Sequence, residues 1–274
     1  RPTTMRHLFS FQLTAALAIA AVLTACASTS TSDPAGDMAF PNVLSSKESV
    51  ALALKDGRRL PGDADRDASR KPAEVLEFFG MGPGMVVLDM FSGGGYYTEL
   101  SAYVVGECGT VWSHNNAAYL AYAADELDRR FAPGRLANVQ RVTAENNALS
   151  LPAETFDQVL MVLAYHDVYY VDPDNGWPRI DAPVMLAELF QSLKRGGVLG
   201  IVDHAAEAGA PADVAQTLHR IDPALLRSDI EQAGFVFEAE STALANPDDD
   251  HGKPMFAEGV RGNTDRFIYR FRRP

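Results

Sequence analysis

A run of three glycines follows an acidic residue near the end of an apolar stretch, VVLDMFSGGGYYTEL, residues 86–100. Glycines after a strand let the backbone approach a ligand closely and adopt positive φ angles. The carboxylate of Asp89 would repel a pyrophosphate, but it suits a ligand that carries a positively charged amine. The stretch therefore predicts a ligand site formed by Asp89, Gly93, Gly94 and Gly95.

Two other classes of glycine turn fit this stretch less well. A phosphate-binding loop would continue with Gly-Lys and then Ser or Thr, and these residues are absent here. A dinucleotide fingerprint has three glycines spaced G-x-G-x-x-G. Gly93 and Gly95 occupy the first two positions, but Thr98 occupies the third. We therefore expect a ligand with a cationic amino-acid tail, and a purely structural turn is the alternative.

A second set of reactive side chains follows two later apolar runs, in the segments YHD (165–167), DH (203–204) and LHRID (218–222). A histidine can remove a proton from a reacting group near neutral pH. We take His166 as the first candidate for a general base, with Asp167 to orient it or His204 in its place. The alternative is that these polar residues only cap strands and tie loops together.

The same histidines raise the question of a metal. His166, His204 and His219 with a carboxylate would be a suitable ligand set for zinc or iron. No tight spacing such as H-x-x-x-H supports this reading, so we predict no metal site.

The candidate residues are far apart in the sequence, and an α/β sheet would bring them together at one edge. The apolar runs alternate with helical patterns, which predicts a Rossmann-like, seven-stranded, mostly parallel sheet flanked by helices, with the last strand antiparallel. Ligands bind beyond the carboxyl ends of the strands in such sheets. We expect strands at 85–90, 109–115, 138–144, 156–167, 198–204, 235–242 and 264–273, helices at 72–79, 96–105, 117–131, 182–197 and 222–234, and helices between the first six strands.

The composition limits the classes of partner. The chain has 274 residues, 47% of them hydrophobic, and a formal net charge of −12, which is enough for one large domain or two small ones. A nucleic-acid-binding protein needs a basic stripe to displace counterions. The densest basic run is Arg270 to Arg273, so we expect no nucleic acid partner.

The first part of the sequence has the features of an export signal. Arg6 and His7 precede an apolar run, residues 8–23, that is shorter and more interrupted than a membrane-spanning helix. The run leads into LTAC, which looks like a bacterial lipobox ending at Cys26. We expect a signal peptide at 1–26, a flexible tether at 27–44 and a folded domain at 45–274. The protein would be an exported lipoprotein, anchored to the membrane on the periplasmic side through a lipid on Cys26. An ordinary signal peptide or a membrane anchor is the alternative.

The glycine turn also carries a family resemblance. VLDMFSGGG resembles the first motif of the class I S-adenosylmethionine-dependent methyltransferases. The resemblance implies that Asp89 lies close to the methionyl part of S-adenosyl-L-methionine and that the glycines shape the turn beneath it. Phe91 stands where the family often has glycine.

Further matches follow in the family's order, from Pro72 to Arg273. Asn115 stands where the family has an acid that binds the ribose hydroxyls, and Asn147, in NNALSLP, where it has an acid that contacts the adenine amine. LKRGGVLGIVDH (193–204) resembles the family's LKPGG helix, turn and strand. The resemblance implies that both asparagines contact the cofactor.

A narrower resemblance is to a group of predicted, often exported, bacterial methyltransferases, on segments that include DADRDASRKP (63–72), AYHDVYY (164–170) and TDRFIYRF (264–271). That group implies no substrate, and we expect the methyl acceptor to be a small molecule. The segment 169–178 would be either a lid over this acceptor or an ordinary loop. Two other functions stay open. One is a non-enzymatic exported lipoprotein that binds a nucleoside-like ligand, and the other is a metal-dependent hydrolase that uses the His and Asp residues.

Overall fold

The structure is a computed structural model, and it describes residues 44–274. The predicted signal peptide, the acylation of Cys26 and the tether up to residue 43 lie outside the described residues and stay predictions. Within residues 44–274, no helix has both the length and the apolar character needed to cross a bilayer.

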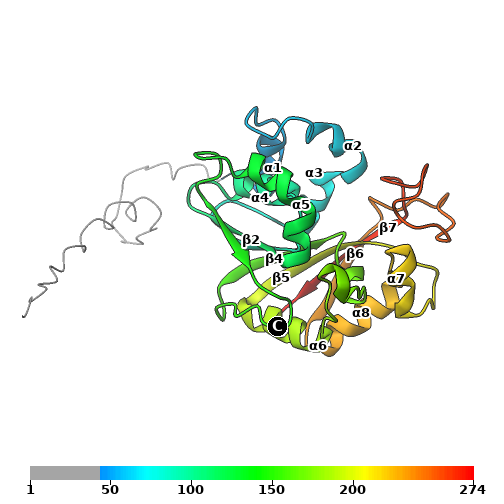
Figure 1. Cartoon of the computed structure of the whole chain (residues 1–274). Coiled ribbons are helices and arrows are strands. Elements are labelled where there is room, and N and C mark those ends of the chain that lie inside the picture. The colour runs from blue at the N-terminus through cyan, green and yellow to red at the C-terminus, as the bar shows by residue number, and fades with distance from the viewer. Residues whose placement is uncertain (1–43) are drawn as a thin grey trace, which may run out of the picture. The chain divides into compact units, whose positions relative to one another are not determined.

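Seven strands form one sheet, in the order β3-β2-β1-β4-β5-β7-β6 (Figure 1). The first five strands pair in parallel, and β7 pairs antiparallel with both β5 and β6. This confirms the predicted mostly parallel sheet with an antiparallel last strand. The strands are β1 Val86–Met90, β2 Thr110–Asn115, β3 Val139–Thr143, β4 Phe156–Val162, β5 Leu193–His204, β6 Val236–Ser241 and β7 Arg266–Arg272.

Helices cover both faces of the sheet. Helices α1, α3 and α4 lie over one face, and α6 and α8 lie over the other (Figure 1). Neighbouring residues of β1 alternate between the two cores: Val87 packs under the first group of helices and Leu88 under the second, as the period of a strand requires. The helices are α1 Ser46–Leu54, α2 Asp67–Arg70, α3 Pro72–Phe79, α4 Tyr96–Val105, α5 Ala117–Arg130, α6 Ala182–Ser192, α7 Ala215–Leu218 and α8 Pro223–Gln232.

Several helices begin and end at the predicted residues because local chemistry determines their ends. Helix α3 starts at Pro72, whose fixed φ suits the first turn, and it ends at Gly80, which adopts the left-handed conformation. Helix α8 begins after Asp222, whose side chain accepts a hydrogen bond from the backbone N–H of Ala224.

Other boundaries differ from the prediction. The fourth strand ends at Val162 rather than at Asp167, and residues Tyr165–Val168 form a short 3₁₀ helix. The predicted helix at 182–197 ends at Ser192, because β5 already begins at Leu193. Residues 144–155 join β3 to β4 without a helix, so the expectation of a helix between each pair of the first six strands is wrong there.

Candidate active site

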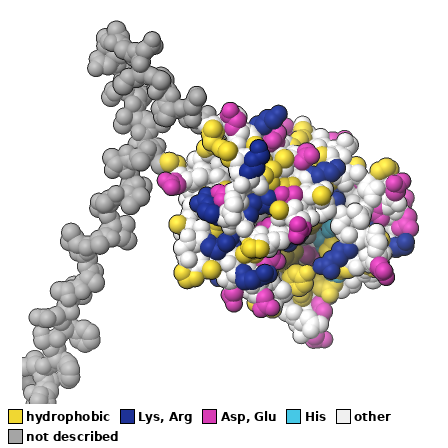
Figure 2. Space-filling model, turned by 90° about the horizontal axis from the view of Figure 1, so that it is seen from above, with side chains coloured by type: hydrophobic (Ala, Val, Ile, Leu, Met, Phe, Trp, Pro, Cys, Tyr) yellow, Lys and Arg dark blue, Asp and Glu magenta, His cyan; other side chains and the backbone are white. Residues whose placement is uncertain are grey.

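A cavity of about 550 Å³ opens at the carboxyl ends of the central strands. Asp89, Val162 and His204 line it from the ends of β1, β4 and β5. Histidine atoms are visible in a hollow on this face of the molecule (Figure 2). The cavity therefore lies at the edge of the sheet where parallel α/β proteins bind their ligands.

Asp89 is a buried carboxylate in the wall of this cavity, with 2% of its surface exposed. Burial raises its pKa to about 7, although the hydrogen bond from Thr98 and the positive charge of Arg130 act in the opposite direction. The Thr98 hydroxyl lies 2.6 Å from the Oδ2 of Asp89. Because its ionised form is poorly solvated, Asp89 would be stabilised by a cation in the cavity.

The glycine turn adopts conformations that need glycine. Gly93 and Gly95 have φ angles of 55° and 79°. A Cβ on Gly95 would lie 2.7 Å from the Cδ of Arg130, and a Cβ on Gly94 would overlap the side chain of Glu126. Gly93 and Gly94 line the cavity, so the side-chain-free backbone faces any ligand bound there.

Phe91, which stands where the resembling family often has glycine, also adopts a positive φ of 52°. Its ring is buried and lies 5.0 Å from the ring of Tyr119 on α5, measured between centroids. The position therefore keeps the backbone conformation that favours glycine, and the aromatic contact with α5 compensates for the strain.

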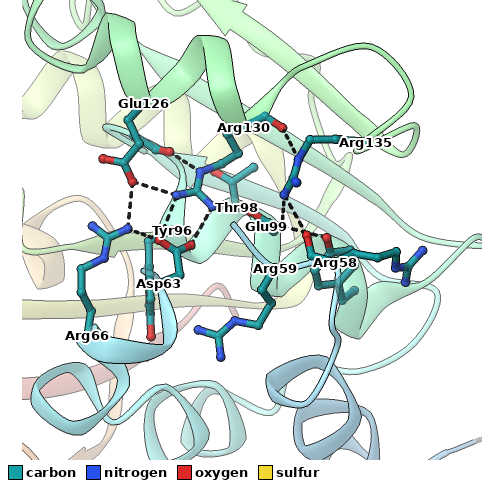
Figure 3. Close-up of polar contacts among 12 residues, drawn as sticks. Arg58, Arg59, Asp63, Arg66, Tyr96, Thr98, Glu99, Glu126, Arg130 and Arg135 are labelled. Atoms are coloured by element: carbon teal, nitrogen blue, oxygen red, sulfur yellow. Dashed lines mark hydrogen bonds and ion pairs between the residues drawn. The ribbon is translucent and has the colours of Figure 1, made fainter. Parts of the chain in front are cut away.

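A network of ion pairs lies beside the glycine turn, and Figure 3 shows its side chains. The side chain of Arg130 is fully buried, contacts Asp63 and Glu126 at 2.8 Å each, and also pairs with Glu99. Its Nε donates a hydrogen bond to the carbonyl of Gly94. Arg66 joins Asp63 to Glu126 at 2.5 and 2.8 Å. The network thus connects α4, α5 and the segment before α2 to the turn, and no residue pattern in the sequence predicts it.

Asn115 and Asn147 do not line the cavity. Asn115 donates to the carbonyl of Gly93 at 3.0 Å and accepts from the N–H of Gly93 at 2.9 Å. Asn147 donates to the carbonyl of Arg179 at 3.0 Å and accepts from the N–H of Asp181 at 2.8 Å. Each amide thus uses one N–H and its oxygen on backbone groups, which leaves a second N–H and a second lone pair. The implied contacts of both asparagines with ribose and adenine stay predictions, and the residues of α5 that line the cavity are Tyr119, Tyr122 and Glu126.

The three predicted catalytic residues do lie together. His166 is fully buried, and its Nδ1 lies 2.7 Å from Oδ1 of Asp203, whose Oδ2 accepts from the backbone N–H of His166. Asp203 therefore orients His166, a role predicted for Asp167. Burial lowers the pKa of His166, but the charges of Asp203 and Asp167 outweigh it and raise the pKa to about 9. The Nε2 of His166 has no hydrogen-bond partner in the described part of the chain.

Asp167, His204 and His219 separate His166 from the cavity and line its wall. Asp167 accepts a hydrogen bond from the Tyr119 hydroxyl at 2.7 Å, and His204 contacts the Thr264 hydroxyl at 2.6 Å. Burial acts to raise the pKa of Asp167, but His166, His219 and Tyr119 hold it below its usual range. Burial and nearby positive charges keep the pKa of His204 well below its usual range.

Arginines line the cavity near Asp89. Arg70 lies over the ring of Tyr96, 4.9 Å from its centroid, and Arg266 donates to the backbone carbonyls of Ser69, Gly262 and Thr264. Among the described residues, the contacts of these two guanidinium groups are with aromatic rings and backbone carbonyls, and neither forms an ion pair with a carboxylate. The cavity therefore offers both a carboxylate and unpaired guanidinium groups, which suits a zwitterionic ligand. The composition gave no signal for them, although Arg70 lies in the segment DADRDASRKP.

The predicted lid segment contributes one residue to the cavity wall. Trp177 lines the cavity, and its ring lies 5.4 Å from that of Tyr119. Tyr169 points elsewhere, because its hydroxyl hydrogen-bonds to Asp229. Tyr170 stacks on His219, another residue of the cavity wall, with 4.9 Å between ring centroids. The segment therefore contacts the site through Trp177 and Tyr170.

Known proteins that are similar to this chain are methyltransferases. No family model matches the chain. The ubiquinone/menaquinone biosynthesis C-methyltransferase UbiE of Hydrogenovibrio crunogenus is 29% identical over 130 residues, which are 47% of this chain and 46% of that relative, so the chain matches less than half of the relative's length.

Solved structures match most of the chain, and two of them serve as examples. A SAM-dependent methyltransferase from Aquifex aeolicus has a TM-score of 0.51 and 21% identity, over 81% of this chain and 97% of that one. An S-adenosylmethionine-dependent methyltransferase from Mesorhizobium loti has a TM-score of 0.52 and 17% identity, over 76% of this chain and all of that one. Strand order, glycine turn and these similarities together show that the chain has the fold of the class I S-adenosylmethionine-dependent methyltransferases.

Proposed function

We propose that the protein is an S-adenosyl-L-methionine-dependent methyltransferase that acts on a small molecule. The observation that carries the proposal is the buried carboxylate of Asp89, which faces a cavity beside the backbone of Gly93 and Gly94. A charged group is retained in a buried position at a cost in stability, and a cationic ligand would offset that cost.

The cavity residues fit the cofactor. A volume of about 550 Å³ lies within the range of small-molecule sites. Asp89 would hold the ammonium group of the methionyl part and Arg70 its carboxylate. The aromatic rings of Tyr119 and Trp177 offer faces on which the adenine of the cofactor would stack. When bound, the cofactor supplies a methyl group on a positively charged sulfur. Asn115 would act indirectly, because it holds Gly93 in place.

The acceptor would lie at the part of the cavity formed by the predicted catalytic residues. Asp167 and His204 reach the wall, so their polar atoms can contact and orient an acceptor. His166 is fully buried and acts behind them, held by Asp203. Transfer in line with a C–S bond depends on the acceptor's orientation, and we assign that task to Asp167 and His204, with His166 as a positioning residue.

Calorimetric titration with S-adenosylhomocysteine tests the proposal. We expect the full chain to bind one equivalent and Asp89→Asn to lose most of the affinity. Asp157→Asn is the matched control, since Asp157 is also a strand carboxylate but bonds to the N–H of Val86, outside the cavity. Failure of the wild type to bind, or equal binding by wild type and Asp89→Asn, would refute the proposal.

We also propose that the domain is exported and tethered to the bacterial membrane by a lipid on Cys26, as in the exported group that the sequence resembles. The support is the basic start, the apolar run and LTAC in residues 6–26. Mass spectrometry of the mature protein should find an acylated Cys26 at its start. Cys26→Ser should move the protein out of the membrane fraction, and an unchanged distribution would contradict the tether.

A further inference from the structure

We propose that His166, Asp167 and His219 form a binding site for a divalent transition metal of the zinc and iron class. The sequence offered no close spacing for such a site, and we predicted none. The fold supplies the proximity instead, because the 3₁₀ helix after β4 carries His166 and Asp167 while His219 follows α7. The metal site does not depend on the proposed activity.

The distances suit a metal with short bonds. The Oδ1 of Asp167 lies 3.4 Å from Nε2 of His166 and 3.5 Å from Nδ1 of His219. Zinc–nitrogen and zinc–oxygen bonds of about 2.1 Å in a tetrahedral site place neighbouring ligand atoms about 3.4 Å apart. One ligand atom from each of the three residues lies within 4.8 Å of the others. Metal binding would close the remaining separation by drawing in the ring of His219, which lies at the cavity wall and stacks on Tyr170.

The Nε2 of His166 points to the same conclusion from a different observation. It is fully buried and has no hydrogen-bond partner among the described residues. A buried polar atom without a partner is costly and needs an explanation. The Oδ1 of Asp167 lies 3.4 Å from Nε2 without forming a hydrogen bond, and a metal bound to both atoms would satisfy Nε2.

The residues behind the ligands are those that metal sites use. Asp203 contacts Nδ1 of His166 at 2.7 Å, which leaves Nε2 as the coordinating nitrogen. Tyr119 donates to Oδ2 of Asp167 at 2.7 Å, which turns Oδ1 toward the two histidines. Such carboxylate–histidine and hydrogen-bonded carboxylate pairs orient the ligands and strengthen binding.

One coordination position would face the cavity. Asp167 and His219 line the cavity wall, while His166 lies behind them. Three protein ligands leave room for a fourth, as in catalytic rather than structural zinc sites. A donor atom of a small molecule in the cavity would therefore complete the coordination.

Metal binding is measured on the full chain after chelator treatment and dialysis, by titration with ZnCl₂ and by the visible absorption of the protein with Co²⁺. We expect one equivalent of Zn²⁺ and a Co²⁺ spectrum of low coordination number. His219→Ala should weaken binding by at least about tenfold, because it removes a ligand, and Asp203→Asn by about 10- to 100-fold. Thermal unfolding of each variant confirms that it is folded.

His251→Ala is the matched control. His251 and His219 have similarly exposed side chains, 24% and 22%, and His251 also lies beside a carboxylate, Asp265 at 3.1 Å. Binding should be unchanged in His251→Ala. Absence of stoichiometric Zn²⁺ in the wild type, or wild-type affinity in folded His219→Ala, would overturn the proposal. Titration of the metal-free protein with S-adenosylhomocysteine tests the proposed activity separately, since Asp89 is not a ligand.

Discussion

The hydroxyl of Thr98 donates a hydrogen bond of 2.6 Å to the buried carboxylate of Asp89. Thr98 occupies the position where a dinucleotide fingerprint has its third glycine. Thr98, the residue that departs from the dinucleotide fingerprint, therefore stabilises the ionised carboxylate of Asp89.

Removal of this hydroxyl should shift the pH at which the site binds its ligand. The bond from Thr98 lowers the pKa of Asp89, so Thr98→Val should raise that pKa further above about 7 and weaken binding of S-adenosylhomocysteine at pH 7. A hydrogen bond to a charged group contributes about 1.5–3 kcal/mol, which corresponds to at least a tenfold loss. Titrations between pH 6 and 8 measure the effect. Thr98→Ser, which keeps the hydroxyl, should behave like the wild type, and an unchanged profile in Thr98→Val would contradict the role.

Asp89→Asn should stabilise the fold at alkaline pH while it removes most of the affinity for S-adenosylhomocysteine. The pKa of Asp89 is raised in the folded state to about 7. The ionisation of Asp89 therefore lowers the free energy of unfolding as the pH rises from about 4, the pKa of an unfolded Asp, to about 7. Above pH 7 the variant avoids a buried charge and gains up to about 4 kcal/mol. Urea unfolding at pH 5 and pH 8 measures the difference between the two proteins. If the difference in the free energy of unfolding does not grow with pH, ionised Asp89 does not destabilise the fold, which would contradict the prediction.

Arg130→Met should destabilise the fold by about 3–5 kcal/mol, because it leaves buried carboxylates without their partner. Arg130 is fully buried and pairs with Asp63, Glu99 and Glu126. Arg129→Met is the control, since Arg129 is exposed on the same helix, and it should change the free energy of unfolding by less than about 0.5 kcal/mol. Denaturant titration compares the two, and similar values would show that the network contributes little.

Asn115→Asp would restore the acid of the resembling family but should lower the free energy of unfolding of this protein. The amide donates to the carbonyl of Gly93, and a carboxylate cannot donate, so the change should cost about 1–3 kcal/mol. Asn147→Asp loses a similar bond to Arg179 at an exposed position, where water replaces it, and should cost less. Thermal unfolding distinguishes the variants. Equal stability of Asn115→Asp and wild type would show that the amide bond to Gly93 is dispensable.

Local sequence was sufficient where local chemistry determines an element. The ends of α3 and α8 follow from Pro72, Gly80 and Asp222, and the seven strands follow from the spacing of apolar residues. The predicted fourth strand is too long because the apolar pattern continues past Val162 into Ala164 and Tyr165. These two residues are buried, but they belong to or adjoin the 3₁₀ helix that follows the strand.

Contacts between distant segments could not be predicted in the same way. Asp63 meets Arg130, and His166 meets Asp203, only because the sheet and α5 bring them together. The roles of Asn115 and Asn147 could not be predicted either, because the resemblance gave their positions but not their hydrogen-bond partners. Clusters of residue types were visible from the sequence, and which member contacts which depended on the fold.

The place of β7 between β5 and β6 has a consequence for synthesis. The ribosome makes β5 and β6 before β7, so β5 keeps an open edge until residues 266–272 have emerged. An unpaired strand edge attracts other polypeptides. Translation that stops before residue 266 should therefore yield an aggregating fragment rather than a shortened enzyme.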